Sequence, residues 1–225
     1  MARALVIIGA GGNAYDILDI VEALNDIALG WRIMGVLDDN LKRGTCHLGL
    51  RVLGRVDDAA KFDDAWFINA IGSDRSYRGR AQIAAVTGLA TDRFATLVHP
   101  GASVSSRATV GNGVAVNHSV VVGGGAVIGD HVLLGPGCIV GHNSVIDDCS
   151  VLAAGSVISG FVHVGRNCYL GARSVVRQRL EIGEGALVGM GAVVVRDVCG
   201  GSTVVGNPAA VLEKARAAET RQGGR

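Results

Sequence analysis

The chain has 225 residues, a length that fits one or two domains, and a formal net charge of +1 at pH 7. That charge balance argues against a surface built for nucleic acid, and an aromatic content of 4% leaves few side chains on which bases could stack. The apolar run Ala4–Ala10 is too short to cross a membrane or to form the core of a signal peptide. None of the five cysteines forms a C-x-x-C pair, so no metal site is predicted. We expect a cytoplasmic protein without nucleic-acid or membrane partners.

The first 95 residues alternate between the patterns of strands and of helices. Short apolar runs predict buried parallel strands, and apolar residues at helical spacing predict helices. The expected strands are Ala4–Ile8, Trp31–Leu37 and Trp66–Ile71, and the expected helices lie around Ile17–Leu24 and at Arg78–Thr87. This order predicts a small Rossmann-like α/β domain over residues 1–95.

A glycine-rich turn, Gly9–Ala14, joins the first predicted strand to the first predicted helix. Its pattern, G-x-G-x-x-A, places backbone N–H groups at a helix N-terminus, a setting that favours a phosphate group. Asp38 and Asp39 follow the second strand, where folds of this kind place the acids that bind ribose. The alternative is a tight turn that needs glycine for its backbone alone. A nicotinamide cofactor fits poorly, because the domain is short and no residues for hydride transfer follow it.

An aliphatic residue recurs at every sixth position from Val98 to Val194, and each of these residues is Val, Ile or Leu. A hexapeptide period of this kind predicts a parallel β-helix over residues 96–210, in which each short strand stacks on its counterpart in the next coil. A β-sandwich does not hold one phase for so long. Residues 211–225 are expected to form a short helix, Val211–Glu219, and a frayed tail.

Other positions of the hexad, numbered from the aliphatic residue, are also patterned. The second position is glycine in many units, which we attribute to corners with unusual backbone dihedral angles. The fifth position is small or β-branched in most units, which predicts a narrow interior. The third position points outward at a corner and holds His118 and His142. With three hexads in each coil, Gly160 follows His142 by one full coil and is expected to lie beside it.

The order of these features resembles one enzyme family. The features on which the resemblance rests are the glycine loop, Leu37–Asn40, Ile71–Ser73, the uninterrupted hexads and the ending Val204–Ala209. Together they resemble the hexapeptide-repeat sugar O- and N-acetyltransferases, typified by sialic acid O-acetyltransferases and PglD-type nucleotide-sugar N-acetyltransferases. The resemblance covers roughly residues 3–212. It implies a left-handed β-helix, a homotrimer, acetyl-CoA held between two neighbouring β-helices, and a nucleotide-linked amino sugar held by the N-terminal domain.

The resemblance also implies site residues. The catalytic histidine of the family corresponds to His142, and the amide of Asn143 beside it can still orient the ring. The spacing places Gly160 next to His142, and because it has no side chain we expect its backbone N–H to be open to the thioester carbonyl. The residues expected at acetyl-CoA are Gly160, Ala172, Gly206, Asn207 and Pro208. The residues expected at the nucleotide-linked sugar are Gly9, Gly11, Gly12, Asn13, Asp38, Asp39, Gly72, Ser73 and Arg75.

Three positions depart from the pattern of the family. Asn143 stands where a carboxylate commonly follows the histidine, Gly135 where Asn is frequent, and Val151 where His is frequent. Asp147 and Asp148 are candidates to replace the missing carboxylate. The leading interpretation is an acetyl-CoA-dependent N-acetyltransferase that acts on a nucleotide-linked amino sugar. Two alternatives stay open, namely O-acetylation of a free sugar such as a sialic acid and a catalytically weak protein that binds a nucleotide-linked sugar.

Overall fold

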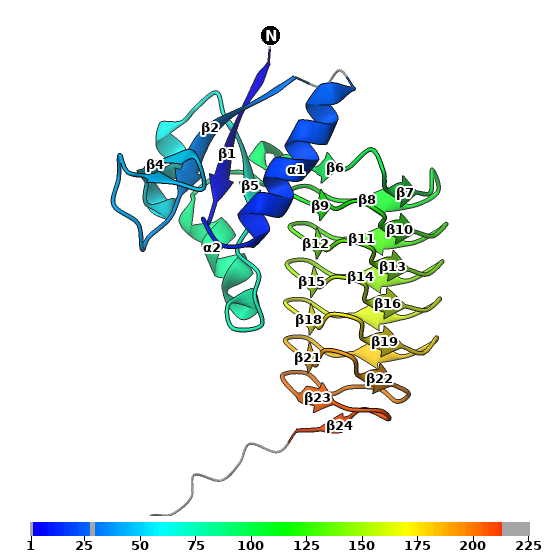
Figure 1. Ribbon diagram of the computed structural model, residues 1–225. Coiled ribbons are helices and arrows are strands. Elements are labelled where there is room, and N and C mark those ends of the chain that lie inside the picture. Colours follow the sequence, from blue (N-terminus) through cyan, green and yellow to red (C-terminus); the bar gives the residue numbers. More distant parts are fainter. Residues whose placement is uncertain (1, 28–29, 213–225) are drawn as a thin grey trace, which may run out of the picture.

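The computed structural model of the protein describes residues 2–27 and 30–212. Figure 1 shows two parts side by side, an α/β domain and a column of stacked coils. The α/β domain lies against one flat side of the column, near the end where the coils begin. None of the helices in the described part of the chain has the length and apolar character that a membrane crossing requires.

The α/β domain is built on a five-stranded sheet with the strand order β3-β4-β2-β1-β5. The strands are β1 (Arg3–Ile8), β2 (Trp31–Leu37), β3 (Cys46–His47), β4 (Leu50–Gly54) and β5 (Trp66–Asn69). All neighbouring strands run parallel except β3, which forms an antiparallel hairpin with β4. The helices are α1 (Asn13–Asp26) and α2 (Arg80–Val86), with 3-10 turns η1 (Val56–Lys61), η2 (Tyr77–Gly79) and η3 (Thr91–Arg93). Helix α1 covers one face of the sheet, and η1 and α2 cover the other.

The main predicted elements of this domain are confirmed. Strand β2 has its predicted bounds, whereas β5 ends two residues before the predicted Ile71. The second predicted helix begins as the 3-10 turn η2 and continues as α2. The hairpin β3–β4 and the turn η1 are not predicted from the sequence, because segments this short carry too few residues to show a period.

The column is a parallel β-helix with three flat sides, each formed by one parallel sheet. Side one, which faces the α/β domain, contains β6 (Leu97–Val98), β9 (Ala115–Val116), β12 (Leu133–Leu134), β15 (Val151–Leu152), β18 (Tyr169–Leu170), β21 (Leu187–Val188) and β23 (Thr203–Val205). Side two contains β7 (Ser103–Val104), β10 (Val121–Val122), β13 (Ile139–Val140), β16 (Val157–Ile158), β19 (Val175–Val176) and β22 (Val193–Val194). Side three contains β8 (Thr109–Val110), β11 (Val127–Ile128), β14 (Val145–Ile146), β17 (His163–Val164) and β20 (Glu181–Ile182).

The pairing between coils confirms the period read from the sequence. Val122 pairs with Val140, which pairs with Ile158, so one coil contains eighteen residues or three hexads. The aliphatic first position is the second residue of each strand from β6 to β22 and points inward. Small residues at the fifth position share this interior, and Ser144 and Ser150 there donate hydrogen bonds to carbonyls of the next coil at 2.8 and 2.9 Å. The narrow interior is therefore filled without unpaired hydroxyl groups at these two positions.

The second-position glycines have a different cause from the one predicted. Positive φ occurs at the fourth hexad position, for example 59° at Asn143 and 66° at Gly113, and not at the second. At the second position a side chain would instead strike the next coil. A β-carbon on Gly141 would lie 2.6 Å from the backbone nitrogen of Gly160. The interpretation by unusual dihedral angles is wrong, because the close stacking of coils at this corner is what excludes a side chain.

The column ends with a change of period. Val204 pairs with Val188 and Val198 bridges to Ile182, so the last coil is two residues shorter than the others. Strand β24 (Ala210–Val211) then turns back antiparallel to β23 and closes the end of the column. The helix expected at Val211–Glu219 falls mainly outside the described residues, and Val211 itself belongs to β24.

One apolar cluster joins the α/β domain to the outer face of the β-helix, whose interior forms a separate core. Ile17 and Ile20 of α1 belong to the same buried cluster as Leu133 and Val151, whose side chains point outward from side one. Residues that would otherwise form an exposed face of the β-helix are therefore buried between the two parts. This packing holds the glycine loop close to side one.

Candidate active site

A cavity of about 430 Å³ opens at the carboxyl ends of β1, β2 and β5, the edge at which parallel α/β sheets bind ligands. We call it the glycine-loop cavity. It is lined by Gly9, Ala10, Gly11, Gly12, Asn13, Asp38, Asn40, Ala70, Ile71, Gly72, Ser73 and Ser76. Seven of the nine residues predicted at the nucleotide-linked sugar are among them. The structure therefore brings most of the predicted substrate residues together at one sheet edge.

The glycine loop is held in place by two polar side chains. Asp38 accepts hydrogen bonds from the backbone N–H groups of Ala10, at 3.0 Å, and Asn40, at 2.8 Å. Asn13 donates from its amide to the carbonyl of Ala70 at 3.0 Å. These bonds tie the loop to the ends of β2 and β5. The carboxylate of Asp38 therefore shapes the cavity as well as lining it.

The glycines of the loop serve two different purposes. Gly9 has a φ of 89°, and a side chain there would collide with Ile71, so the turn itself requires glycine. For Gly11 and Gly12, none of the described residues apart from their immediate chain neighbours has an atom within 4 Å of the position that a β-carbon would take. They leave open space at the N-terminus of α1, where a ligand can approach the backbone closely.

Two predicted substrate residues, Asp39 and Arg75, do not line the cavity. Asp39 accepts a hydrogen bond from the Val56 N–H at 2.9 Å and lies 3.7 Å from the guanidinium of Arg55. Ser76, which sequence reasoning did not single out, lines the cavity with its hydroxyl 2.9 Å from that of Ser73. The spacing Ser73-x-x-Ser76 was the available signal, since hydroxyls three residues apart commonly bond within a turn.

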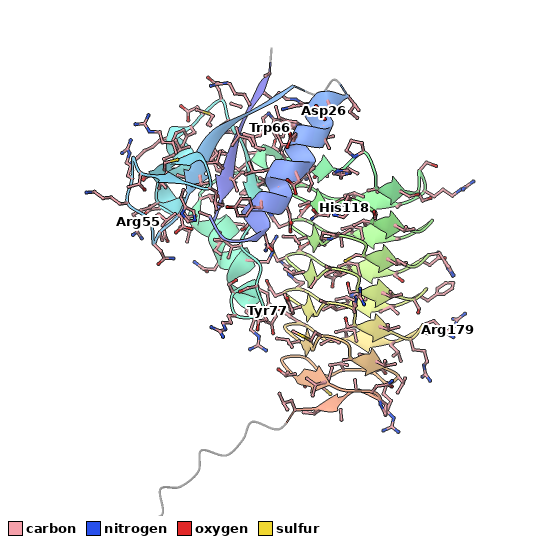
Figure 2. The ribbon with its side chains drawn as sticks, viewed as in Figure 1. Asp26, Arg55, Trp66, Tyr77, His118 and Arg179 are labelled. Carbon is pink, nitrogen blue, oxygen red and sulfur yellow. The ribbon has the colours of Figure 1, made fainter. Side chains whose placement is uncertain are left out.

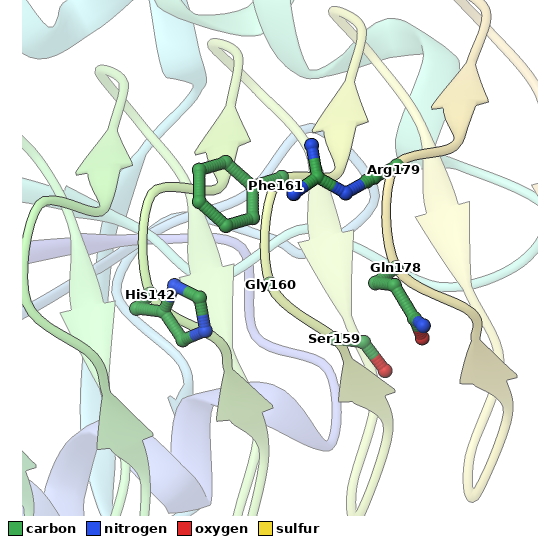
Figure 3. Close-up of a pocket in the computed structure, with 6 residues that line it drawn as sticks. All are labelled: His142, Ser159, Gly160, Phe161, Gln178 and Arg179. Atoms are coloured by element: carbon green, nitrogen blue, oxygen red, sulfur yellow. The ribbon is translucent and has the colours of Figure 1, made fainter.

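A second cavity, of about 390 Å³, lies at the corner between sides two and three (Figure 3). It is lined by His142, Ser159, Gly160, Phe161, Gln178 and Arg179. A β-carbon on Gly160 would lie 2.8 Å from the Nε2 atom of His142, so the imidazole lies directly over this glycine. None of the described residues accepts a hydrogen bond from the Gly160 N–H. The corner therefore offers an imidazole and a free backbone donor side by side.

Two neighbours set the orientation of the His142 ring. Its Nδ1 atom lies 3.1 Å from the amide oxygen of Asn143, and the ring of Phe161 meets it edge to face with centroids 5.0 Å apart. An amide oxygen can only accept a hydrogen bond, so in this contact Nδ1 is the donor. Asp147 and Asp148 do not contact His142. Asp147 instead lies 2.9 Å from His163, and Asp148 accepts from the Asp130 N–H.

Both the α/β domain and the β-helix match known protein families. Residues 4–84 match the PglD N-terminal domain family, and residues 125–160 match the bacterial transferase hexapeptide repeats. The acetyltransferase domain of PglB from Neisseria gonorrhoeae, solved with acetyl coenzyme A, is 31% identical over 94% of this chain and 100% of that chain, with a TM-score of 0.80. The chain belongs to the hexapeptide-repeat sugar acetyltransferase family. The three-sided column is the left-handed parallel β-helix of that family.

Further relatives in the hexapeptide-repeat sugar acetyltransferase family have known substrates. PerB from Caulobacter crescentus, solved with CoA and GDP-perosamine, is 28% identical over 93% of this chain and 97% of that chain, with a TM-score of 0.79. The UDP-N-acetylbacillosamine N-acetyltransferase of Bacillus subtilis is 32% identical over 114 residues. That match spans 50% of the length of the curated relative and 49% of this chain.

The residues expected at acetyl-CoA are spread over two corners of this family's β-helix and the closing end of the column. Gly160 belongs to the corner between sides two and three, whereas Ala172 belongs to the corner between sides one and two. A third cavity, of about 430 Å³, contains Ala172 together with Asp74, Tyr169, Gly171, Leu187, Gly189, Met190 and Val205. Gly206 lies near it, after Val205, and its carbonyl accepts from the Val193 N–H at 2.9 Å. Asn207 and Pro208 are exposed at the closing end of the column. One chain alone does not bring Gly160 and Ala172 together.

Two departures from the family pattern have clear surroundings. A β-carbon on Gly135 would lie 2.9 Å from the carbonyl oxygen of Leu152, so this glycine is needed for the stacking of coils. Val151 is buried between the domains, with its Cγ2 atom 3.1 Å from the position of a β-carbon on Gly72. It packs beneath the glycine-loop cavity and offers no polar group there.

Proposed function

We propose that this protein transfers the acetyl group of acetyl-CoA to the amino group of a nucleotide-linked amino sugar. The observation that carries the proposal is the pairing of His142 with the free N–H of Gly160 in a chain that also holds a glycine-loop cavity. Relatives support it, because PerB binds CoA and GDP-perosamine and the PglB domain binds acetyl coenzyme A.

In the proposed reaction, Nε2 of His142 accepts a proton from the sugar amine as the nitrogen attacks the thioester carbonyl. The carbonyl oxygen gains negative charge and accepts a hydrogen bond from the Gly160 N–H, a contribution worth about 3 kcal/mol. The carbon–sulfur bond then breaks, and the CoA thiolate takes up the proton that His142 accepted from the amine. Asn143 keeps the proton of the imidazole on Nδ1, so that Nε2 is free to act as the base.

Asn143 favours an amine over a hydroxyl acceptor. Its amide oxygen orients the ring but, being neutral, stabilises the imidazolium less than a carboxylate does. An amine that is partly deprotonated near neutral pH needs less help from the base than a hydroxyl group. We therefore favour N-acetylation over O-acetylation of a free sugar, and we propose a catalytic protein over one that only binds nucleotide-linked sugars.

We also propose that the active site forms between copies of the chain in a homotrimer. The α/β domain packs on side one, while His142 lies at the opposite corner, between sides two and three. Figure 2 shows Arg179, which lines the His142 cavity, on the far side of the β-helix from the α/β domain. A nucleotide-linked sugar in the glycine-loop cavity therefore needs His142 from a neighbouring copy. The same arrangement would join Gly160 of one copy with Ala172 of the next around acetyl-CoA.

We propose that the chain divides into two functional domains at residue 95. Residues 1–95 bind the nucleotide-linked sugar, and residues 96–210 carry out acetyl transfer. Hydrogen bonding supports this boundary, because Ala95 bonds to Phe67 of the α/β sheet and Leu97 bonds to Val114 of the β-helix. We also propose that the protein acts in the cytoplasm.

The test is a thiol-release assay with acetyl-CoA and a panel of UDP-, dTDP- and GDP-linked amino sugars. We expect release with at least one of them and none with the matching sugar nucleotides that carry a hydroxyl in place of the amine. Mass spectrometry of the product identifies an amide that is stable to mild base. Release with free sialic acid alone would favour O-acetylation, and no release with any acceptor would favour the binding protein.

A further inference from the structure

Arg80 is a buried charge that has no counter-ion among the described residues. It is the first residue of α2, and its side chain has no exposed surface. Among the described residues its guanidinium donates only to backbone carbonyls, those of Asn69 at 3.5 Å, His131 at 2.5 Å and Ile71. Within residues 2–27 and 30–212 no carboxylate forms an ion pair with it, and its Nε has no partner. An unpaired buried charge is costly, so a further anion nearby would be stabilising.

The guanidinium lies immediately behind the wall of the glycine-loop cavity. A β-carbon on Gly72, which lines that cavity, would lie 3.0 Å from Nη1 of Arg80 and 3.5 Å from the amide nitrogen of Asn13. Gly72 therefore contacts the guanidinium and lines the cavity. At such a distance, through protein and away from water, the field of a unit charge is weakly screened.

The peptide between Ile71 and Gly72 connects the charge to the cavity. Its carbonyl oxygen accepts a hydrogen bond from Arg80, and in a trans peptide the N–H points the opposite way. The Gly72 N–H thus points away from Arg80, and no described residue accepts a hydrogen bond from it. Hydrogen bonds in series polarise one another, so the charge of Arg80 strengthens this N–H as a donor.

Arg80 keeps its charge at neutral pH. Burial lowers the pKa of its guanidinium to about 10, which still leaves it protonated. The N–H groups of Gly11 and Gly12, at the N-terminus of α1, likewise have no acceptor among the described residues. The wall of the cavity therefore combines a fixed positive charge with several free backbone donors, and it suits a group with two negative charges.

We propose that Arg80 is a positioning residue for the diphosphate of the nucleotide-linked sugar, acting through the Ile71–Gly72 peptide without touching the substrate. This inference rests on the proposed function, since it assumes a nucleotide diphosphate in the glycine-loop cavity. The bond from Arg80 to the carbonyl of His131 also anchors this wall to the β-helix. Arg80 thus holds the diphosphate at a fixed place relative to side one.

The test compares diphosphates with uncharged nucleosides by calorimetry. UDP, GDP and dTDP are titrated into the full-length protein, each beside its nucleoside, and the tightest pair is kept. We expect Arg80→Gln to weaken diphosphate binding at least tenfold while nucleoside binding stays within twofold. Arg80→Lys, which keeps the charge, should stay within about threefold for both. Arg78→Gln is the matched control, because Arg78 is exposed and bonds to the carbonyls of Gly185 and Gly201 instead.

Equal losses for diphosphate and nucleoside in Arg80→Gln, or no loss for either, would overturn the inference. If Arg80→Gln does not fold, NMR spectroscopy of the unmodified protein replaces the variant. The measured signal is the side-chain Nε–H resonance of Arg80, which is assigned by its disappearance in Arg80→Lys. It should shift on addition of the diphosphate and not of the nucleoside, and an identical response to both would contradict the proposal. If the unmodified protein binds none of the three diphosphates, the proposed function itself fails.

Discussion

His142 is the residue on which the proposed chemistry depends most. We expect His142→Ala to lower kcat by about 10²-fold with an amine acceptor, the low end for general-base catalysis, because part of the amine is already deprotonated. His142→Asn fills the space but cannot accept the proton, so it should lower kcat by a similar factor. Thiol release at saturating substrates measures both. His118→Ala changes a histidine at the same hexad position on another corner and serves as the control. Full kcat in His142→Ala would remove this residue from the mechanism.

Asn143 offers a gain-of-function test at the same corner. Its amide oxygen lies 3.1 Å from Nδ1 of His142, and an aspartate there would replace a neutral bond by a charge-assisted one. The difference of about 1 kcal/mol corresponds to a rate increase of roughly fivefold, largest for a hydroxyl acceptor. Aspartate tolerates the φ of 59° at this position, so the fold should not suffer. A rate that falls in Asn143→Asp would show that the amide serves another purpose.

His131 makes stability depend on pH. Burial first, and the charge of Arg80 second, hold the pKa of His131 below its usual 6.5, while Asp130 and Asp148 oppose the shift. The unfolded chain therefore binds a proton more readily than the folded one. The contribution of neutral His131 is fully present above pH 6.5 and is lost progressively as the pH falls below that value. Thermal unfolding from pH 8 to pH 5 should show this fall, and His131→Asn should flatten it. An unchanged slope in the variant would contradict the assignment.

At the scale of the coil, glycine at the second hexad position is a packing requirement. A β-carbon on Gly123 would lie 2.7 Å from the backbone nitrogen of His142 in the next coil, whereas one on the adjacent Gly124 would meet nothing closer than 3.5 Å. We expect Gly123→Ala to lower the free energy of unfolding by about 2 kcal/mol, as overpacking does. Gly124→Ala should change it by less than about 0.5 kcal/mol. Denaturant unfolding at equal protein concentration measures both free energies. Equal effects of the two substitutions would show that the stacking of coils does not require glycine at the second hexad position.

At the scale of the whole molecule, sides two and three carry a surface that a single copy leaves exposed. On these sides Val121, Val127, Ile139 and Val175 are each between 37% and 42% exposed. Closure into a trimer covers such a surface. We expect Ile139→Asp to give monomers in light scattering and to abolish acetyl transfer while nucleotide binding survives. A monomeric unmodified protein at micromolar concentration would refute the trimer.

Sites shared between copies can also be tested by complementation. Co-expression of His142→Ala with Asp38→Ala should restore part of the activity that each variant lacks alone. In a mixed trimer some sites combine an intact histidine from one copy with an intact glycine-loop cavity from its neighbour. Sites contained within one chain would show no such recovery.

The sequence by itself determined the β-helix and the placement of Gly160 beside His142. Each coil repeats the same local geometry, so an eighteen-residue spacing translates directly into contact between neighbouring coils. It also located the glycine loop and most of the residues that line its cavity, because parallel strands end at one common edge. Both inferences hold because they depend only on regular spacing along the chain and on the common edge at which parallel strands end.

Only the tertiary structure decided which polar groups line each cavity and where the domains meet. Asp38 lines the cavity and Asp39 does not, although they are adjacent in sequence, because the backbone turns between them. Arg80 reads as an ordinary surface residue of a helix, yet packing against the β-helix buries its charge behind Gly72. The docking of the α/β domain on side one, opposite the His142 corner, likewise follows from contacts between residues far apart in the chain. Such contacts have no period, and no spacing along a single sequence encodes them.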